Sequence, residues 1–201
     1  MNYLAIDTSG KHLTVAIKYN GSYKTYFTEN CGVDHSSSLM PTVERLLTEI
    51  GAKLSEMDFF ACVVGAGSFT GIRIGVSTVK ALCLAYGKKC LGVTSFDTLA
   101  YDIKSENTLA VIDAKHGNYY ICGYKGNEKV IPESFVTTEE LTTLCKGYTV
   151  VSFTDIPFEH KQADILNGLI KAVEEKQDNL LEDINALTPV YIRKSQAEEN
   201  R

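Results

Sequence analysis

The sequence lacks the marks of three common classes of protein. None of its six cysteines falls in a C-x-x-C pair, so we expect buried free thiols. No stretch approaches the roughly 20 apolar residues of a membrane span, and the opening apolar run stops at Asp7, too short for a signal peptide. With 20 Lys and Arg against 25 Asp and Glu, the formal charge is −5. Electrostatics alone therefore give no general attraction to nucleic acid or to an anionic membrane.

Metal binding and nucleophilic catalysis also find little support. A single imidazole, His35, stands where an H-x-x-x-H motif would place two on one helix face, because the position four residues later is Leu39. The four histidines are scattered along the chain, so no Cys–His pair is indicated. We expect neither a bound metal nor a catalytic thiol.

What is present suffices for a folded core. The chain has 201 residues, of which 44% are apolar, enough for one domain of ordinary size or two small ones. We expect a cytoplasmic protein without membrane association.

The first half reads as three strands followed by alternating helices and strands. Asn20-Gly21 is a strong signal for a tight hairpin, and Gly51 is placed to end a helix in which Pro41 must lie in or near the first turn. We expect strands at 4–7, 13–19, 23–28, 59–64 and 91–93, and helices at 36–50, at 70–86 and from Ser95 onward. This order predicts a mixed sheet with helices packed on it, as in the ribonuclease-H-like fold.

The second half repeats the theme on a smaller scale. We expect strands at 109–113, 119–124, 130–136 and 148–153, a capping box at 137–140 and an amphipathic helix at 161–176. The polar segment at 101–107 indicates a boundary. The prediction is an α/β protein with one lobe at 1–104 and a smaller lobe at 105–201.

Two aspartates end apolar strands, one in each half. Asp7 precedes Thr8-Ser9-Gly10, and Asp113 precedes a turn that contains Gly117. Two such carboxylates are how actin-like kinases hold a magnesium nucleotide between two lobes. An ordinary Asx turn at each strand end is the alternative. A ribonuclease-type site needs further carboxylates, which the central strand does not supply.

The glycine-rich segment Gly65-Ala66-Gly67-Ser68-Phe69-Thr70-Gly71 follows a buried strand and opens a helix. Its spacing misses G-x-G-x-x-G by one residue, and no lysine follows to reach a phosphate. We favour a tight turn that needs small residues for close backbone approach over an anion site.

The helix that follows is apolar on two opposite faces. One stripe contains Ile72, Val76 and Cys83, and the other contains Ile74 and Thr78. One face can cover this chain's own sheet, while the other must be buried in a neighbouring helix or in a partner. We assign the Val76 stripe, with Gly71 and Gly75 at small-x-x-x-small spacing, to the partner, and the Ile74 stripe to the sheet. A helix buried wholly in its own domain is the alternative.

These motifs together resemble the bacterial YeaZ/TsaB family, and the match runs from the first strand to residue 193. The matching segments are Leu4-Ala5-Ile6-Asp7-Thr8-Ser9, His35-Ser36-Ser37-Ser38-Leu39-Met40-Pro41, the glycine-rich segment continued by Ile72-Arg73-Ile74-Gly75, Gly92-Val93-Thr94-Ser95, Asp113-Ala114-Lys115 and Pro189-Val190-Tyr191-Ile192-Arg193. The resemblance implies an actin-like ATPase fold of two ribonuclease-H-like lobes, the second apparently trimmed. It also implies a role in making threonylcarbamoyladenosine at position 37 of tRNA.

By this resemblance the chain is a non-catalytic partner of the paralogous Gcp/TsaD transferase. It would also join a small ATPase, form a homodimer when alone and meet tRNA only within the complex, while ATP and magnesium would belong to the wider complex. The interface would use the helices 36–50 and 70–86. The expected interface residues are Leu39, Val43, Gly71, Ile72, Arg73, Gly75, Val76, Val79 and Cys83, and a doubtful nucleotide site comprises Asp7, Thr8, Ser9 and Asp113. The alternatives are an ATP-dependent transferase or kinase working through Asp7 and Asp113, and a self-associating scaffold.

Overall fold

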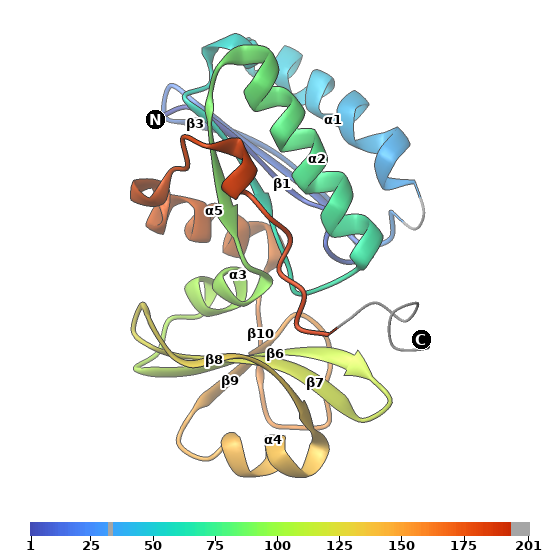
Figure 1. The fold of residues 1–201 in the computed structure, drawn as a ribbon, viewed down its shortest axis with the longest axis vertical. Coiled ribbons are helices and arrows are strands. Elements are labelled where there is room, and N and C mark those ends of the chain that lie inside the picture. Colours follow the sequence, from blue (N-terminus) through green and yellow to red (C-terminus); the bar gives the residue numbers. More distant parts are fainter. Residues whose placement is uncertain (32–33, 194–201) are drawn as a thin grey trace.

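The computed structural model describes residues 1–31 and 34–193, which form two stacked lobes (Figure 1). The first lobe's elements are β1 (Tyr3–Asp7), β2 (Leu13–Tyr19), β3 (Ser22–Thr28), α1 (His35–Ile50), the short 3-10 helix η1 (Leu54–Glu56), β4 (Phe59–Val63), α2 (Phe69–Tyr86), β5 (Lys89–Val93) and α3 (Ser95–Asp102). The remaining elements are β6 (Asn107–Lys115), β7 (Asn118–Lys125), β8 (Glu128–Thr137), α4 (Thr138–Leu144), β9 (Thr149–Ser152), β10 (Lys161–Gln162), α5 (Ile165–Glu175), η2 (Gln177–Asn179) and η3 (Ile184–Ala186).

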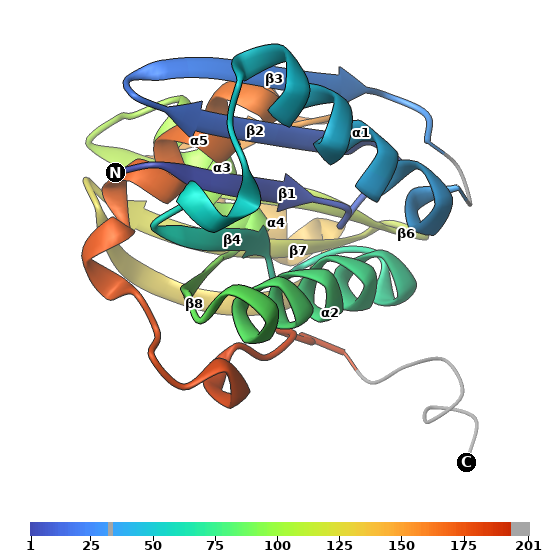
Figure 2. The same cartoon turned by 90° about the horizontal axis from the view of Figure 1, so that it is seen from above.

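The two sheets have the same topology. The first runs β3-β2-β1-β4-β5, with antiparallel pairing among β1, β2 and β3 and parallel pairing from β1 through β4 to β5. The second runs β8-β7-β6-β9-β10 with the same sequence of directions. The predicted mixed sheets, and with them the actin-like α/β fold of two ribonuclease-H-like lobes, are confirmed. Figure 2 shows the first sheet in face view.

Local turn chemistry follows the sequence closely. Asn20 and Gly21 both have positive φ, 50° and 80°, as a type I′ hairpin requires. Gly51 ends α1 in the left-handed conformation, with φ of 71°. Pro41 lies one turn deeper in α1 than predicted. Pro41 and Ser37 are both exposed, so water can bond the Ser37 carbonyl that the proline cannot.

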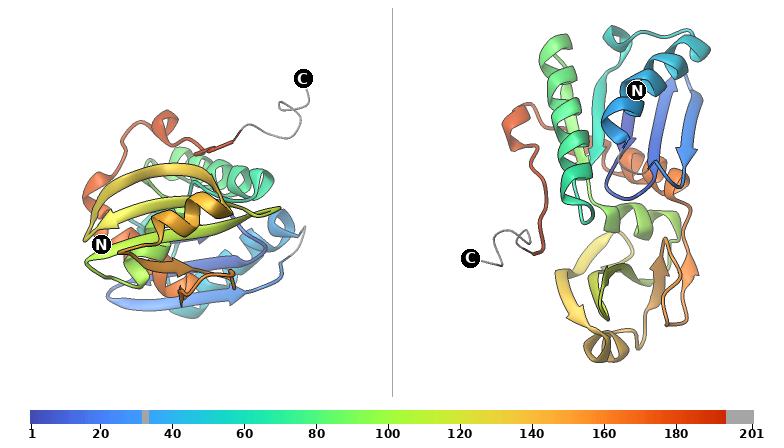
Figure 3. Two further views of the ribbon diagram at one scale, coloured as in Figure 1. Left: turned by 90° about the horizontal axis from the view of Figure 1, so that it is seen from below. Right: turned by 90° about the vertical axis from the view of Figure 1, so that its right-hand side faces the viewer.

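Each sheet is covered on both faces, and two of the covering helices change lobes. α1 and α2 cover one face of the first sheet, and α5 covers the other by packing Leu169 and Val173 against Tyr3 and Ala5. α3 packs on the second sheet, where Phe96 joins a core cluster with residues of β6 and β7. Figures 1 and 3 show α3 and α5 lying between the two sheets.

This exchange corrects the predicted lobe boundaries. The strands divide between 1–104 and 105–201 as expected, but α3 belongs to the second core and α5 to the first. Chain order predicts which helix follows which strand, and it does not say on which sheet a helix at a lobe boundary will pack. The resulting contact between the lobes is a packed apolar core, which disfavours large independent lobe movement.

The chain after α5 returns along the first lobe as a strap, residues 180–193. Leu181 pairs with Cys90 at the edge of the first sheet, Leu187 is buried in the first core, and the Val190 amide donates to the Val64 carbonyl at 2.7 Å. Figure 3 shows this strap descending beside α2. The strap therefore belongs to the first lobe for most of its length.

All six cysteines are free thiols, as predicted, and four of them are buried. Burial raises the pKa of Cys122 to about 11 and that of Cys83 to about 12. Thiols with pKa values this high are poor nucleophiles at neutral pH.

Candidate functional site

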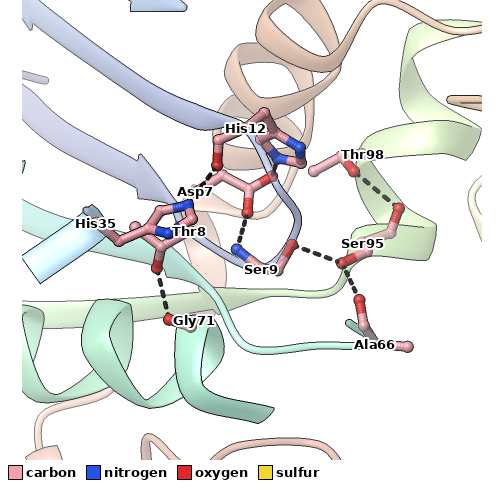
Figure 4. A network of polar contacts seen from close by, with 9 residues as sticks. All are labelled: Asp7, Thr8, Ser9, His12, His35, Ala66, Gly71, Ser95 and Thr98. Carbon is pink, nitrogen blue, oxygen red and sulfur yellow. Dashed lines mark hydrogen bonds and ion pairs between the residues drawn. The ribbon is translucent and has the colours of Figure 1, made fainter. Parts of the chain in front are cut away.

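The carboxylate of Asp7, at the end of β1, is completely buried and has a partner on each oxygen. The Ser9 amide donates to Oδ1 at 2.8 Å, and Nε2 of His12 lies 2.8 Å from Oδ2 (Figure 4). His12 is itself buried, and its carbonyl lies 2.8 Å from Nε2 of His35.

Asp7 and His12 each favour the charged form of the other. Burial opposes charge on both groups, but the imidazole and the hydrogen bonds from His12 and Ser9 lower the pKa of Asp7 below its usual value. Burial likewise opposes a charged His12, and the Asp7 carboxylate nevertheless raises the pKa of that imidazole. The pair is a buried, hydrogen-bonded ion pair at a strand end.

The glycine-rich turn is filled by this chain's own backbone. A Cβ on Gly71 would lie 1.9 Å from the Thr8 carbonyl oxygen, and one on Gly67 would lie 2.3 Å from that of Ser9. A Cβ on Gly65 would lie 2.4 Å from the Val190 carbonyl oxygen. These glycines permit close approach of the Asp7 loop and the strap, as the favoured structural interpretation predicts.

Polar contacts then fasten this turn to the start of α3. Ser95 donates its hydroxyl to the Ala66 carbonyl at 2.6 Å and lies 3.3 Å from the Ser9 hydroxyl. Thr8 donates its hydroxyl to the Gly71 carbonyl at 2.7 Å. Figure 4 shows these contacts around Asp7.

The doubtful nucleotide residues do not form one site. Asp7, Thr8 and Ser9 are buried together, whereas Asp113 is partly exposed and bonds within its own turn to the Lys115 amide and ammonium. Asp7 is covered by His12 and the glycine turn is occupied, so these residues do not fit a magnesium nucleotide.

The described ranges also contain no group of three or more His, Cys, Asp and Glu side chains arranged to hold a metal ion. None of the described helices has the length and apolar character needed to cross a membrane.

The Val76 stripe of α2 faces the first sheet, which reverses the predicted assignment of the two faces. Eight of the nine expected interface residues are buried inside this chain's own lobe, and they are Leu39, Val43, Gly71, Ile72, Gly75, Val76, Val79 and Cys83. Arg73 alone among them is exposed. The cause is the Asp7 loop, which needs Gly71 and Gly75 against it: a Cβ on Gly75 would lie 2.8 Å from the Thr8 hydroxyl.

The outer face of α2 is the surface left open. Ile74 and Thr78 are half-buried, Ala81 and Ala85 are exposed, and Leu84 is 71% exposed. We call this set, together with Arg73 and Ser77, the outer face.

At its N-terminal end the outer face meets α1 in a groove of about 420 Å³. Met40 of α1 and Phe69, Arg73, Ile74 and Thr78 of α2 line it. The groove is thus an exposed, largely apolar strip between α1 and α2, the two helices that cover the same face of the first sheet.

Arg73 is held at the edge of this groove by a residue from the far end of the chain. Its guanidinium carbon lies 3.8 Å from the Phe69 ring centroid, and its Nε donates to the Tyr191 hydroxyl at 2.9 Å. The rings of Phe69 and Tyr191 stack with centroids 4.5 Å apart. Both residues lie in motifs of the family resemblance, but their contact is not evident from the sequence because 118 positions separate Arg73 from Tyr191.

A family model described as TsaD, tRNA N6-adenosine threonylcarbamoyltransferase, matches residues 29–154, more than half of the chain. The chain belongs to this family. The tRNA threonylcarbamoyladenosine biosynthesis protein TsaB of Escherichia coli is 34% identical over 135 residues, covering 65% of this chain and 58% of that protein. The TsaB protein of Bacillus subtilis is 28% identical over 225 residues, covering 98% and 96%.

The solved structures agree on the fold. YeaZ from Pseudomonas aeruginosa superposes with a TM-score of 0.79 at 23% identity, covering 94% of this chain and 99% of that one. The resemblance to the YeaZ/TsaB branch is confirmed by these relatives together. The matched region nevertheless spans only 58% of the Escherichia coli relative.

Proposed function

We propose that this chain acts in tRNA threonylcarbamoyladenosine biosynthesis as a non-catalytic subunit. In this role it binds the paralogous threonylcarbamoyl transferase of the Gcp/TsaD family, and the small ATPase joins the same complex. The names of the TsaB relatives, which are tRNA threonylcarbamoyladenosine biosynthesis proteins, support the pathway. The closed Asp7 loop supports the lack of catalysis, and the outer face supports the partner.

Three features of the Asp7 loop favour a supporting role over phosphoryl or carbamoyl transfer. Both oxygens of Asp7 have partners within the chain. The glycine turn approaches backbone carbonyls where a phosphate would need room. The lobes share a packed core through α3, so a cleft that opens and closes around substrate is disfavoured.

The observation that carries the proposal is the exposed apolar outer face beside the α1–α2 groove. Leu84 is 71% exposed on an otherwise well-packed lobe, and small neighbours at Ser77, Ala81 and Ala85 allow a helix to approach closely. A largely apolar groove with polar residues at its edge is typical of a protein interface. When the transferase is absent, a second copy of the chain is the expected occupant.

A reconstitution experiment tests the proposal. The purified chain alone should neither hydrolyse ATP over multiple turnovers nor modify tRNA, and adding it to the transferase, the small ATPase and the substrates should raise the yield of modified tRNA. The chain alone should also bind tRNA weakly, since a charge of −5 gains little from counterion release.

The matching family model is described as a transferase, so the alternative that this chain is itself an enzyme needs a direct test. Multiple turnovers by the lone, magnesium-supplemented chain that disappear in Asp7→Ala would establish it and overturn the proposal. A submicromolar, salt-sensitive complex of the lone chain with tRNA would contradict the proposed route to tRNA.

A further inference from the structure

Arg73 is a cation that is oriented without a carboxylate. Its guanidinium stacks on the Phe69 ring at 3.8 Å, and Tyr191 accepts a hydrogen bond from Nε. Guanidinium carries five N–H donors in a planar fork, and the bond to Tyr191 uses one of them. Among residues 1–31 and 34–193, ten ion pairs are found and none includes Arg73.

The side chains that line the groove together with Arg73 are all neutral. The described residues that line the groove are Ser, Thr, Leu, Met, Phe and Ile in addition to this arginine. Arg73 is the one positive group in the groove lining, and a rigidly held cation there is complementary to an apolar segment that carries one negative group. Bidentate pairing with a carboxylate uses the planar fork that stacking on Phe69 keeps in place.

We propose that Arg73 receives the carboxylate of an Asp or Glu side chain on the helix of the transferase that docks along the outer face. This inference rests on the proposed function and adds its recognition chemistry. Phe69 and Tyr191 act as positioning residues, because they fix the guanidinium before the partner arrives and so reduce the entropy lost on binding.

The groove favours a carboxylate on a protein over a nucleic-acid phosphate. Binding a phosphate backbone depends on several Lys or Arg side chains acting together, and the groove lining supplies one. The apolar side chains that line the groove beside Arg73, among them Met40 and Ile74, suit an amphipathic helix.

The backbone contacts of the strap at Val190 fix the position of Tyr191. The amide of Val190 bonds to Val64 at 2.7 Å, and a side chain at Gly65 would collide with the Val190 carbonyl. The backbone of the strap is thereby fixed one residue before Tyr191. The C-terminal strap therefore takes part in partner recognition although it lies outside both helices of the groove.

The test is the affinity of the transferase for Arg73→Gln, with Arg45→Gln as the matched control. Arg45 is also an exposed arginine beside an aromatic ring, on α1, but it already pairs with Glu49 at 2.8 Å. We expect the dissociation constant to rise at least about tenfold for Arg73→Gln and to stay unchanged for Arg45→Gln. Tyr191→Phe should give a smaller rise, of about two- to fivefold.

Charge exchange identifies the acceptor. Arg73→Glu should abolish binding, and one Asp→Arg or Glu→Arg substitution on the docking helix of the transferase should restore it. Unchanged melting temperatures of the Arg73 variants exclude misfolding as the cause.

Three results would overturn the inference in distinguishable ways. If Ile74→Glu abolishes binding while Arg73→Gln binds like the unmodified chain, the outer face is the interface but Arg73 holds no carboxylate. If neither variant changes the affinity, the proposed interface itself has failed. Loss of tRNA binding in Arg73→Gln with unchanged transferase affinity would assign the arginine to phosphate.

Discussion

The two faces of α2 both carry apolar side chains but lie in opposite environments. The inner face places Gly71, Gly75 and Val76 against the Asp7 loop and the first sheet, where Val76 is 5% exposed. The outer face leaves Ala81 exposed and Leu84 71% exposed. The difference arises from the glycines, because the loop lies too close to the helix there to admit a side chain.

This contrast teaches that small-x-x-x-small spacing marks close approach without naming what approaches. In α2 the approaching element is the Thr8 backbone of the same chain, with its carbonyl oxygen 1.9 Å from a would-be Cβ on Gly71. The partner surface is instead the face with exposed Leu84 and Ala81, whose helical stripe looks equally apolar in sequence.

The largest effect that separates the two faces is expected from Val76→Glu. Burying an unpaired carboxylate against the first sheet should lower the free energy of unfolding by about 3–5 kcal/mol. The matched variant on the outer face, Ala81→Glu, should change it by less than about 0.5 kcal/mol because that side chain stays in water. Urea denaturation of the purified chain measures both. Equal destabilisation by the two variants would show that both faces of α2 are internal.

The loop under the inner face depends on the Asp7–His12 ion pair, so His12→Ala should loosen it. Burial opposes a charged His12, but the charge of Asp7 and its hydrogen bond outweigh burial and raise the pKa of His12. The contribution of His12 to stability is therefore complete below its unfolded pKa of about 6.5. It is lost as pH rises through the pKa of the folded state. The pKa of Asp7 is lowered, so its contribution is complete above about pH 4 and is lost as pH falls through the folded value.

Between those limits we expect His12→Ala to reduce the free energy of unfolding by about 2 kcal/mol. The difference from the unmodified chain should shrink as pH falls below about 4 towards the lowered pKa of Asp7, and shrink again as pH rises through the raised pKa of His12. Denaturation curves across this range provide the measurement. A difference that does not vary with pH would mean that the two side chains do not form an ion pair in solution.

Elements governed by local chemistry could be predicted from the sequence. Asn20-Gly21 specifies its turn because both residues tolerate positive φ, and Thr137 with Glu140 forms the predicted capping box at the start of α4. The strand order followed from the alternation of helices and strands.

Features that join distant parts of the chain could not be predicted in this way. Periodicity shows that α3 and α5 are amphipathic, but each packs on the sheet of the other lobe. The Asp7–His12 pair spans only five residues, and its signal is a histidine directly before the next strand, whereas the sequence offers for Asp7 a doubtful nucleotide site or an Asx turn. The contact of Arg73 with Tyr191 depends on the path of the strap.

The central claim, that the outer face docks the transferase while the inner face holds the fold, is tested most directly by Ile74→Glu. Titration calorimetry with the transferase should show a dissociation constant raised at least about tenfold, about 1.4 kcal/mol, with the lone chain still folded although the half-buried Ile74 packs against the first core. Unchanged affinity in a folded Ile74→Glu chain, or an Ile74→Glu chain that unfolds, would contradict the account.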